Sequence, residues 1–165
     1  AKYVNSPDTP LFHKGQVLYN FATARKAAKE AGSMVVAEGY MDVIALAQGG
    51  IAQAVAPLGT AMTEDHLRML WHSVSEPILC LDGDKAGQRA MMRAAEMALP
   101  LITAGKGLRF ALLPGGHDPD SLLRAQGPQA LRAALDRAIP LSEALWNHAL
   151  TEHPQITPEG RARLE

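Results

Sequence analysis

Residues 77–87, PILCLDGDKAG, combine an apolar run, two aspartates and the beginning of a helical pattern. The apolar half is typical of a buried strand, and the alanine-rich stretch 85–99 favours a long helix. Residues 34–42, MVVAEGYMD, have the same arrangement, since four apolar residues precede Glu38 and a helical pattern at 42–48 follows. A strand that ends in a carboxylate and leads into a helix thus occurs twice, which favours an α/β fold.

The rest of the central region continues this alternation. Apolar runs at 52–56 and 108–113 predict two more strands. A helix is expected over 63–73, where Thr63 is a good N-cap and two acidic residues follow it. Apolar strands that alternate with helices are typical of parallel sheets. We therefore predict a parallel sheet of about four strands, flanked by helices.

Outside this region the sequence predicts helices and turns. A turn-rich stretch at 5–10 precedes a helix over 23–31, and the chain from Asp120 onward shows only helical patterns. Those patterns predict helices at 121–126, 128–138 and 141–150 and a further one that begins at Pro158. The expected organisation is the tail of a preceding subdomain at 1–31, a metal-binding α/β unit at 32–117, and a helical subdomain at 118–165 that is cut short.

The composition restricts the class of protein. The chain has 165 residues, of which 47% are hydrophobic and 20% charged, a balance typical of a folded domain. No apolar run approaches the ~20 residues of a membrane-spanning helix, and no signal peptide is recognisable. A single cysteine excludes an intramolecular disulfide framework and a cysteine zinc site, and it suits a reducing cytoplasm. The net charge of −1 argues against a general grip on nucleic acid, which usually needs a basic domain.

Acidic side chains follow three of the predicted strands. Glu38 ends the first, Asp82 and Asp84 end the third, and Asp118 and Asp120 follow the fourth. The carboxyl ends of parallel strands share one edge of a sheet, so these acids meet there if the first and third strands are neighbours. Close carboxylates repel one another unless a cation lies among them, and Mg²⁺ or Mn²⁺ prefers oxygen ligands. The pattern therefore predicts a divalent metal site at this edge.

Each acid also has a simpler interpretation. The tripeptide 82–84 has the composition of a turn, Asp118 before Pro119 suits an N-cap, and Asp120 suits the first turn of a helix. Glu38 is harder to explain in this way, because a charge directly after a buried strand is costly unless it is exposed or paired. Acids at three strand ends favour a metal site over three unrelated turns.

Basic residues lie next to these acids. Lys85, Arg89 and Arg93 are four residues apart, so they share one face of the predicted helix. Lys85 and Arg89 either contact the phosphates of a nucleotide or nucleic acid or are simply solvated, and Arg93 is expected to be solvated. Three other side chains are expected to be buried, namely Cys80, Trp71 and Trp146.

The acidic motifs resemble those of a known family. Residues 38–43, EGYMDV, 82–87, DGDKAG, and 118–120, DPD, are similar to the motifs of the Toprim catalytic core, which bacterial primases and topoisomerases share. Residues 2–15, KYVNSPDTPLFHKG, resemble the segment that leads into the Toprim core of DnaG-type bacterial DNA primases. LGTA at 58–61 also fits that family, so the resemblance extends over essentially the whole chain.

The resemblance implies a nucleotidyltransferase, dependent on Mg²⁺ or Mn²⁺, that copies single-stranded DNA into short RNA primers from ribonucleoside triphosphates. It implies Glu38, Asp82 and Asp84 as catalytic residues and main metal ligands, Asp118 and Asp120 as further metal-binding acids, and Asp42 as a characteristic acid of the first motif. The parent protein is expected in the bacterial cytoplasm, at the replication fork. Its template-binding subdomain would precede residue 32, and its N-terminal zinc-binding domain and C-terminal helicase-docking domain would lie outside this chain.

Two alternatives give the same acids other roles. In a phosphatase of the haloacid dehalogenase type, an Asp-x-Asp after a strand supplies a nucleophile and an acid. Residues 85–87 lack the threonine that is usual there, and Glu38 would have no role. A non-enzymatic phosphoacceptor receiver domain would need paired acids after the first strand and a lone aspartate after a middle one. The order in this chain is the reverse.

Overall fold

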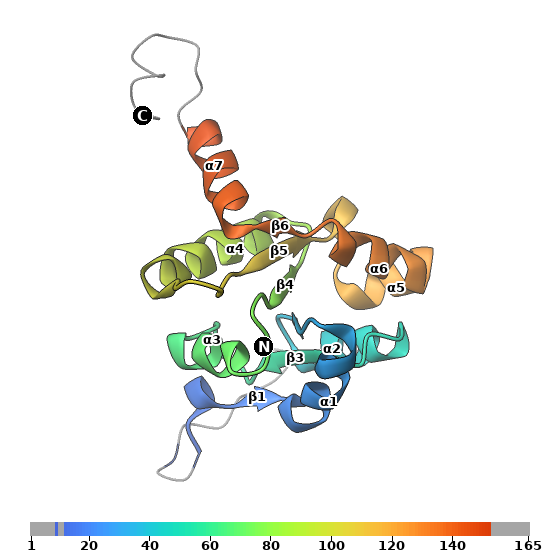
Figure 1. Ribbon diagram of the computed structural model, residues 1–165. Coiled ribbons are helices and arrows are strands. Elements are labelled where there is room, and N and C mark those ends of the chain that lie inside the picture. Colours follow the sequence, from blue (N-terminus) through green and yellow to red (C-terminus); the bar gives the residue numbers. More distant parts are fainter. Residues whose placement is uncertain (1–8, 10–11, 153–165) are drawn as a thin grey trace.

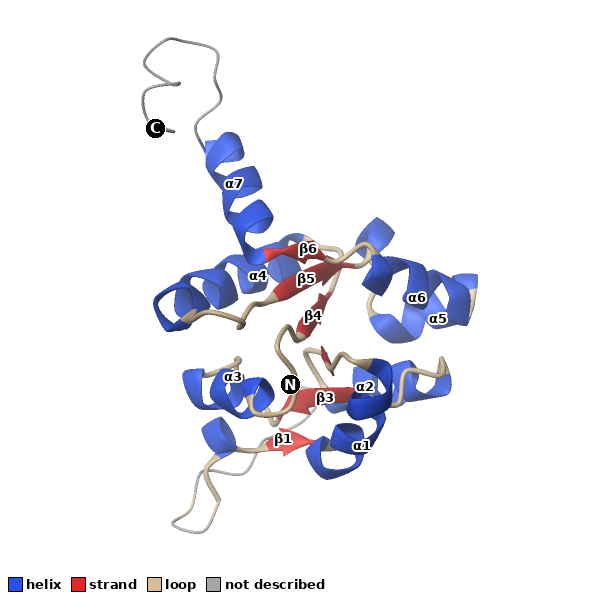
Figure 2. Cartoon of the chain, in the orientation of Figure 1, coloured by secondary structure: helices blue, strands red, loops and turns tan. Residues whose placement is uncertain are grey.

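A six-stranded sheet forms the centre of the computed structural model, which describes residue 9 and residues 12–152 (Figure 1). The strand order is β1-β3-β2-β4-β5-β6, and Figure 2 shows these strands arranged in that succession across the molecule. The four inner strands are mutually parallel: β3 (Ala54–Pro57), β2 (Val35–Val36), β4 (Ile78–Leu81) and β5 (Arg109–Leu112). They confirm the four strands and the α/β fold predicted from the sequence.

The two outer strands were not predicted. β1 (Leu18–Tyr19) pairs antiparallel with β3, and β6 (Ile139–Pro140) pairs antiparallel with β5. The expectation of only helical patterns after Asp120 is therefore wrong at β6. A two-residue strand is too short to show a periodicity of its own, so only its partner strand defines it. Pro140 is tolerated there because an edge strand does not need every N–H group for pairing.

Helices cover both faces of this sheet (Figure 1). One face packs against α1 (Phe21–Ala31), α3 (Glu64–Trp71), α4 (Lys85–Ala98) and α7 (Leu141–Glu152). The other face packs against α2 (Tyr40–Gln48), α5 (Pro119–Gln126) and α6 (Pro128–Asp136). Short 3₁₀ helices lie at η1 (Lys14–Gln16), η2 (Leu99–Leu101) and η3 (Pro114–Gly116). These elements confirm the predicted helices, except that the helix expected from Pro158 lies outside the described residues, as does the turn-rich stretch 5–10 apart from Thr9.

Local chemistry explains several helix boundaries. Thr63 is the N-cap of α3, and its side-chain oxygen accepts a hydrogen bond from the backbone N–H of His66 at 3.2 Å. Gly32 ends α1 in the left-handed conformation, with φ of 68°. Pro119 and Pro128 stand in the first turns of α5 and α6, where their missing N–H groups cost nothing.

The core consists of two apolar layers, one on each face of the sheet. Phe110, Leu67 and Leu70 are among the fully buried side chains of one layer, and Leu46 and Leu122 belong to the other. Burial of such side chains is the main source of stability in a domain of this size. Each helix in the described part of the chain is too short or too polar to cross a bilayer.

Two of the three side chains that the sequence predicted to be buried are buried in the structure. Cys80 and Trp71 are buried as predicted, and the Trp71 Nε1–H group donates to the carbonyl oxygen of Gly107 at 2.8 Å. Trp146 is 51% exposed, so its predicted burial is wrong. Only the first part of α7 packs against the sheet, and the helix then projects away from it (Figure 1). The helical pattern of 141–150 does not indicate how far such contact extends.

Candidate functional site

The two strands that carry the principal acids are neighbours. β2 and β4 pair in parallel, with Val36 opposite Leu79. The chain leaves β2 toward β3 on one side and leaves β4 toward β5 on the other, so a topological switch point lies between them. Ligands of open α/β sheets bind at the carboxyl ends of the strands at such a point. Glu38 follows β2 there, and its Oε1 atom accepts a hydrogen bond from the backbone N–H of Asp82 at 3.4 Å.

The glycines of the DGDKAG motif allow the backbone to pack closely around these acids. A Cβ atom on Gly83 would lie 1.9 Å from the carbonyl oxygen of Leu113, and one on Gly87 would lie 2.0 Å from the carbonyl oxygen of Asp82. The Gly83 N–H group donates to the carbonyl oxygen of His117 at 3.0 Å. The motif therefore brings the loop after β5, which carries the DPD acids, against the loop after β4.

Asp84 has a structural role that the sequence analysis missed. It is the N-cap of α4, and its Oδ1 atom accepts hydrogen bonds from the N–H groups of Ala86 and Gly87, both at 2.8 Å. One carboxylate oxygen is thus committed to the helix terminus. The signal was available, because an aspartate directly before a helical pattern is a strong N-cap candidate.

Asp42 lies in the first turn of α2 and fixes the loop that carries Glu38. Its Oδ2 atom accepts a hydrogen bond from the N–H group of Gly39 at 2.9 Å. Burial raises the pKa of Asp42 above its ordinary value, and the charges of Asp118, Glu38 and Asp120 add to this effect against the opposing influence of the Gly39 hydrogen bond. Asp42 is therefore both a local anchor and a member of the acidic group.

The acids of the DPD motif are held by interactions within α5. Asp118 is the N-cap, as the sequence predicted, and its Oδ1 atom accepts a hydrogen bond from the Ser121 N–H group at 2.7 Å. That hydrogen bond lowers the pKa of Asp118. Asp120 lies in the first turn and pairs with Arg124 at 3.0 Å. Because α2 contacts α5, these acids lie on the same side of the site as Asp42.

Asp82 experiences the combined charge of the group. Burial raises its pKa to about 7, and the neighbouring carboxylates of Glu38, Asp42, Asp118 and Asp84 contribute in that order. Burial, with smaller contributions from nearby acids, also raises the pKa of the Cys80 thiol to about 12, so this thiol is unreactive at neutral pH. Negative charge is thus concentrated at this edge of the sheet, and no cation of the chain offsets it at Asp82.

The acids do not form a ready-made metal cage. Within residue 9 and residues 12–152, no three acidic, histidine or cysteine side chains are arranged to ligate one ion. Asp42, Asp84 and Asp118 each use one oxygen to accept backbone N–H groups. The donor chemistry nevertheless fits a hard divalent cation, because the cluster consists of carboxylates and a cation among them would relieve the repulsion that raises the pKa of Asp82.

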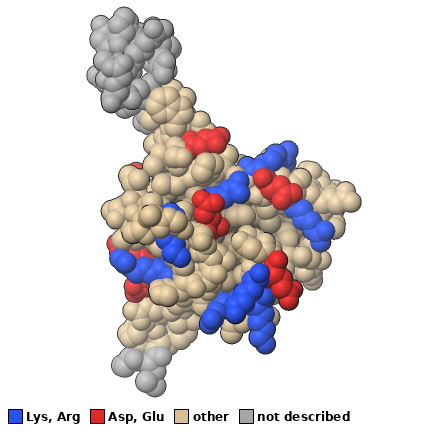
Figure 3. All heavy atoms as spheres, viewed as in Figure 1, with Lys and Arg blue, Asp and Glu red and all other residues tan. Residues whose placement is uncertain are grey.

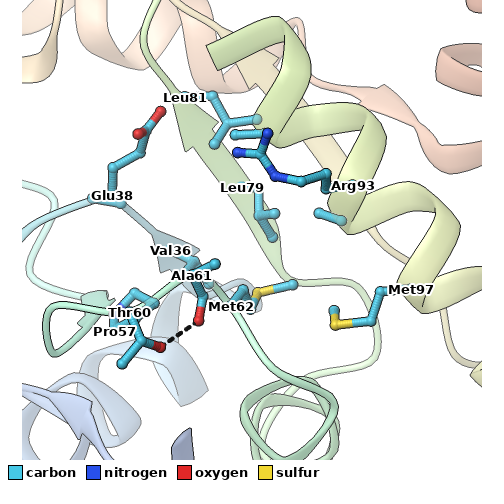
Figure 4. A pocket seen from close by; sticks show the side chains of 13 residues that line it. Val36, Glu38, Pro57, Thr60, Ala61, Met62, Leu79, Leu81, Arg93 and Met97 are labelled. Atoms are coloured by element: carbon cyan, nitrogen blue, oxygen red, sulfur yellow. Dashed lines mark hydrogen bonds between the residues drawn. The ribbon is translucent and has the colours of Figure 1, made fainter. Parts of the chain in front are cut away.

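An apolar cavity of about 290 Å³ adjoins the acids at the switch point. Its floor includes Val36, Leu79 and Leu81, and Figure 4 shows Glu38 and Arg93 on opposite sides of it. Arg93 is exposed, as expected, but it borders the same cavity as Glu38. The sequence did not indicate this proximity, because it depends on how α4 packs across β4.

The basic residues nearest the acids lie on the surface. Lys85 and Arg89 are exposed on α4, next to Asp84. On the face seen in Figure 3, basic and acidic side chains are interspersed, as the net charge of −1 would suggest. Any nucleic-acid contact by this chain is therefore expected to be local and not spread over a strongly basic surface.

Comparisons with known proteins match nearly the whole chain. The model of the Toprim domain matches residues 32–109, and that of the N-terminal domain of the DNA primase catalytic core matches residues 1–25. The DNA primase of Escherichia coli K12 is 49% identical over 163 residues, which cover 99% of this chain and 28% of that protein. The DNA primase of Pseudomonas aeruginosa is 49% identical over 164 residues, 99% of this chain and 25% of that protein. This chain thus spans about a quarter of the length of these bacterial relatives.

Solved structures give the same result. A DNA primase domain from Pseudomonas aeruginosa is similar with a TM-score of 0.91 and 49% identity, covering 99% of this chain and 51% of that one. A DnaG primase catalytic domain bound to single-stranded DNA is similar with a TM-score of 0.89 and 48% identity, covering 98% of this chain and 51% of that one. Together with the acids at the carboxyl edge of the sheet, these matches establish that the chain belongs to the DnaG-type bacterial DNA primases and contains their Toprim domain.

Proposed function

We propose that the protein containing this chain is a DNA primase, which copies single-stranded DNA into short RNA primers from ribonucleoside triphosphates. The observation that carries the proposal is the meeting of Glu38 and Asp82 at the switch point, within a group of carboxylates that raises the pKa of Asp82 to about 7. An uncompensated acidic group at a ligand-binding edge suits chemistry that uses divalent cations.

Toprim primases are metal-dependent as a family. For this chain we propose Mg²⁺ or Mn²⁺, held by Glu38, Asp82 and the uncommitted oxygen of Asp84, with Asp118 and Asp120 as further acids. Such ions lower the pKa of an attacking 3′-hydroxyl and neutralise charge on the reacting phosphates. This chemistry needs no covalent nucleophile from the protein.

The residues around the ions would position them and the substrate. The Asp82 N–H group orients Glu38, which acts as a metal ligand or as a general base for the hydroxyl proton. Asp42 fixes the loop of Glu38 through the Gly39 N–H group. Lys85 and Arg89 would contact phosphates of the nucleotide or nucleic acid, which they can reach because both are exposed beside Asp84.

The partners of the whole protein are part of the same proposal. Single-stranded DNA would be the template, ribonucleoside triphosphates the substrates and an RNA primer the product. A C-terminal domain beyond this chain would dock on the replicative helicase, an N-terminal domain would hold zinc, and the protein would act in the bacterial cytoplasm. The bacterial DNA primases matched above support this setting.

We also retain the division of the chain into the tail of a template-binding subdomain at 1–31, a Toprim metal-binding unit at 32–117 and a helical subdomain at 118–165. α5 and α6 bury Leu122 and Leu131 against the sheet. The boundary at 117 therefore marks a change to mostly helical elements, with β6 still paired to the sheet, and not a separate core.

The two alternatives considered from the sequence have no support. The chain matches DNA primases over 99% of its length, which leaves the haloacid-dehalogenase-type phosphatase and the receiver domain without a structural or sequence basis. We further propose that the 165-residue chain alone binds divalent metal but makes primers poorly, because its net charge of −1 provides little grip on a template. Efficient primer synthesis by this chain alone would contradict that part.

The deciding experiment replaces one acid in the whole protein. We expect Asp82→Asn to abolish dinucleotide formation, because the variant loses a metal ligand, while its circular dichroism and unfolding midpoint show a folded protein. Asp136→Asn, an exposed acid of α6, is the matched control and should retain activity. Retained activity in Asp82→Asn would refute the metal role. A manganese anomalous map supplies an independent readout, with ions expected between Glu38, Asp82 and Asp84.

A further inference from the structure

A groove of about 780 Å³ lies between α4 and α7, outside the acidic group but beginning beside it. One wall carries Lys85, Arg89 and Arg93, and the other carries Asn147 and His148. All five side chains are exposed. The groove is thus a surface channel with a cationic wall and a polar wall, and its cationic wall starts directly after Asp84.

Two arginines on other helices form salt bridges, whereas most cations of the described residues, including those of this groove, form none. Arg68 of α3 pairs with Glu64 at 3.3 Å, and Arg124 of α5 pairs with Asp120 at 3.0 Å, each over one helical turn. Within the described part of the chain, none of the three α4 cations takes part in a salt bridge. Their charge is therefore available to a ligand.

Their arrangement also opposes the local stability of α4. Cations four residues apart repel one another by a few tenths of a kcal/mol per pair. The N-terminus of α4 already has a negative charge, because the Asp84 carboxylate caps it, so the repulsion among the cations is the cost that remains. A bound anion would remove this repulsion. An arrangement of charges that lowers the stability of a helix without improving the fold indicates a functional role.

The spacing suits a polymer of phosphates. Four residues advance a helix by ~6 Å, so the cations from Lys85 to Arg93 extend over ~12 Å along the groove. A single nucleotide could occupy only part of that length, whereas successive phosphates of an extended strand could meet all three cations. The acidic side chain of Glu96 lies beyond Arg93 in the same groove and would repel such a strand.

We infer that the α4–α7 groove binds the backbone of the single-stranded DNA template near the acidic site. This inference rests on the proposed primase function, and it names a surface that guides the strand. The strand is assigned as DNA because a template must extend past the acids from the first bond formed, when no primer yet exists. Its phosphates would lie on Lys85, Arg89 and Arg93, which act by positioning the strand.

The test measures binding of a fluorescein-labelled oligothymidylate, about a dozen nucleotides long, to the 165-residue chain by anisotropy at several salt concentrations in EDTA. Metal chemistry is absent there, so failure of the primase proposal does not affect the result. Arg89→Ala and Arg93→Ala should each weaken binding about fivefold and lower the salt slope by about 0.7. Arg68→Ala of α3 is the matched control and should change neither value.

A second variant is expected to increase the affinity for the oligonucleotide, a result that misfolding could not produce. Glu96→Gln removes the acid of the groove and should tighten binding about twofold to fivefold, whereas Glu64→Gln of α3 should not. No binding by the unsubstituted chain at low salt, or equal binding by all variants, would overturn the inference. Tighter binding of an oligouridylate with the same dependence on Arg89 and Arg93 would overturn the assignment to DNA.

Discussion

The two edges of the parallel sheet differ in how their polar groups are satisfied. At the edge where β4 and β5 begin, the Trp71 Nε1–H group and the Lys106 ammonium donate to backbone carbonyls, and the Gly107 N–H group donates to Ser75. At the edge where β2 and β4 end, Glu38 and Asp82 lie together and the pKa of Asp82 rises to about 7. At the first edge, called the satisfied edge below, these polar groups hydrogen-bond within the chain. At the second, the acidic edge, carboxylate charge remains that a bound cation could neutralise.

This difference indicates how the fold separates stability from function. Carboxylates that repel one another destabilise the free protein, so their concentration at one edge has to be compensated by packing elsewhere. The buried layers on both faces and the satisfied edge supply that stability. Removing a hydrogen-bonded polar side chain from the first edge should therefore destabilise the fold, whereas removing a repelled carboxylate from the second should stabilise it.

The largest effect is expected at the satisfied edge. Trp71→Ala should lower the free energy of unfolding by about 3–5 kcal/mol, because it leaves a cavity and an unpaired Gly107 carbonyl. Urea denaturation monitored by circular dichroism measures the change. Trp146→Ala removes the same side chain from an exposed position and should cost well under 1 kcal/mol. Equal losses in the two variants would contradict the difference in burial.

Gly83→Ala tests whether the acidic edge also depends on close packing. The new Cβ atom would lie 1.9 Å from the Leu113 carbonyl oxygen, so the loops after β4 and β5 must separate, at a cost of about 3 kcal/mol. The unfolding midpoint measures this loss. Gly105→Ala meets no atom within 4 Å and should cost about 1 kcal/mol through its φ of 76° alone. A Gly83→Ala chain as stable as Gly105→Ala would show that the loops can separate freely.

His66 is a buried polar side chain whose two ring nitrogens both have hydrogen-bond partners, in contrast to the repelled acids of the acidic edge. The His66 Nδ1 atom accepts from the Thr63 N–H group, and its Nε2 atom lies 2.9 Å from the Lys14 carbonyl oxygen. His66→Leu should cost about 2 kcal/mol, because these groups lose their partner. Burial lowers the pKa of His66, so the folded state binds its proton less readily than the unfolded state does. Stability should therefore fall as pH drops below about 6.5, and the cost of His66→Leu should shrink there.

The result that would contradict this is a cost of His66→Leu that stays constant from pH 8 to pH 5 in urea denaturation. Thr63→Ala, which removes the N-cap of the same helix but no titrating group, is the control. Its cost of about 1 kcal/mol should not depend on pH.

The smallest effect has the opposite sign. In EDTA at pH 8, Asp82→Asn should stabilise the chain by on the order of 1 kcal/mol, because it removes a partly exposed, repelled charge. The raised pKa of Asp82 means that its repulsion is fully present above about pH 7 and is lost as pH falls toward 4. The gain should accordingly disappear at low pH. Thermal unfolding at both pH values measures it, and a loss of stability at pH 8 would contradict the assigned repulsion.

Much of the fold follows from the sequence, because buried strands and helix caps are local patterns. The four parallel strands, the helices and the N-cap roles of Thr63 and Asp118 could all be predicted. The acidic motifs also indicated which residues belong to the site. The sequence could predict that Glu38 and Asp82 meet only if their two strands are neighbours. Strand order depends on contacts between distant segments, and the structure shows that these strands pair.

The tertiary structure alone decided the remaining features. The two-residue strands β1 and β6 exist only through their partners, and the exposure of Trp146 depends on where α7 leaves the sheet. Packing of α4 across β4 brings Arg93 to the cavity of Glu38, and the loop contact at Gly83 joins the acids of separate motifs. The sequence by itself determined which side chains this protein has for its chemistry. Their mutual distances, and so their charge and their pKa values, were determined by long-range packing, which no local pattern encodes.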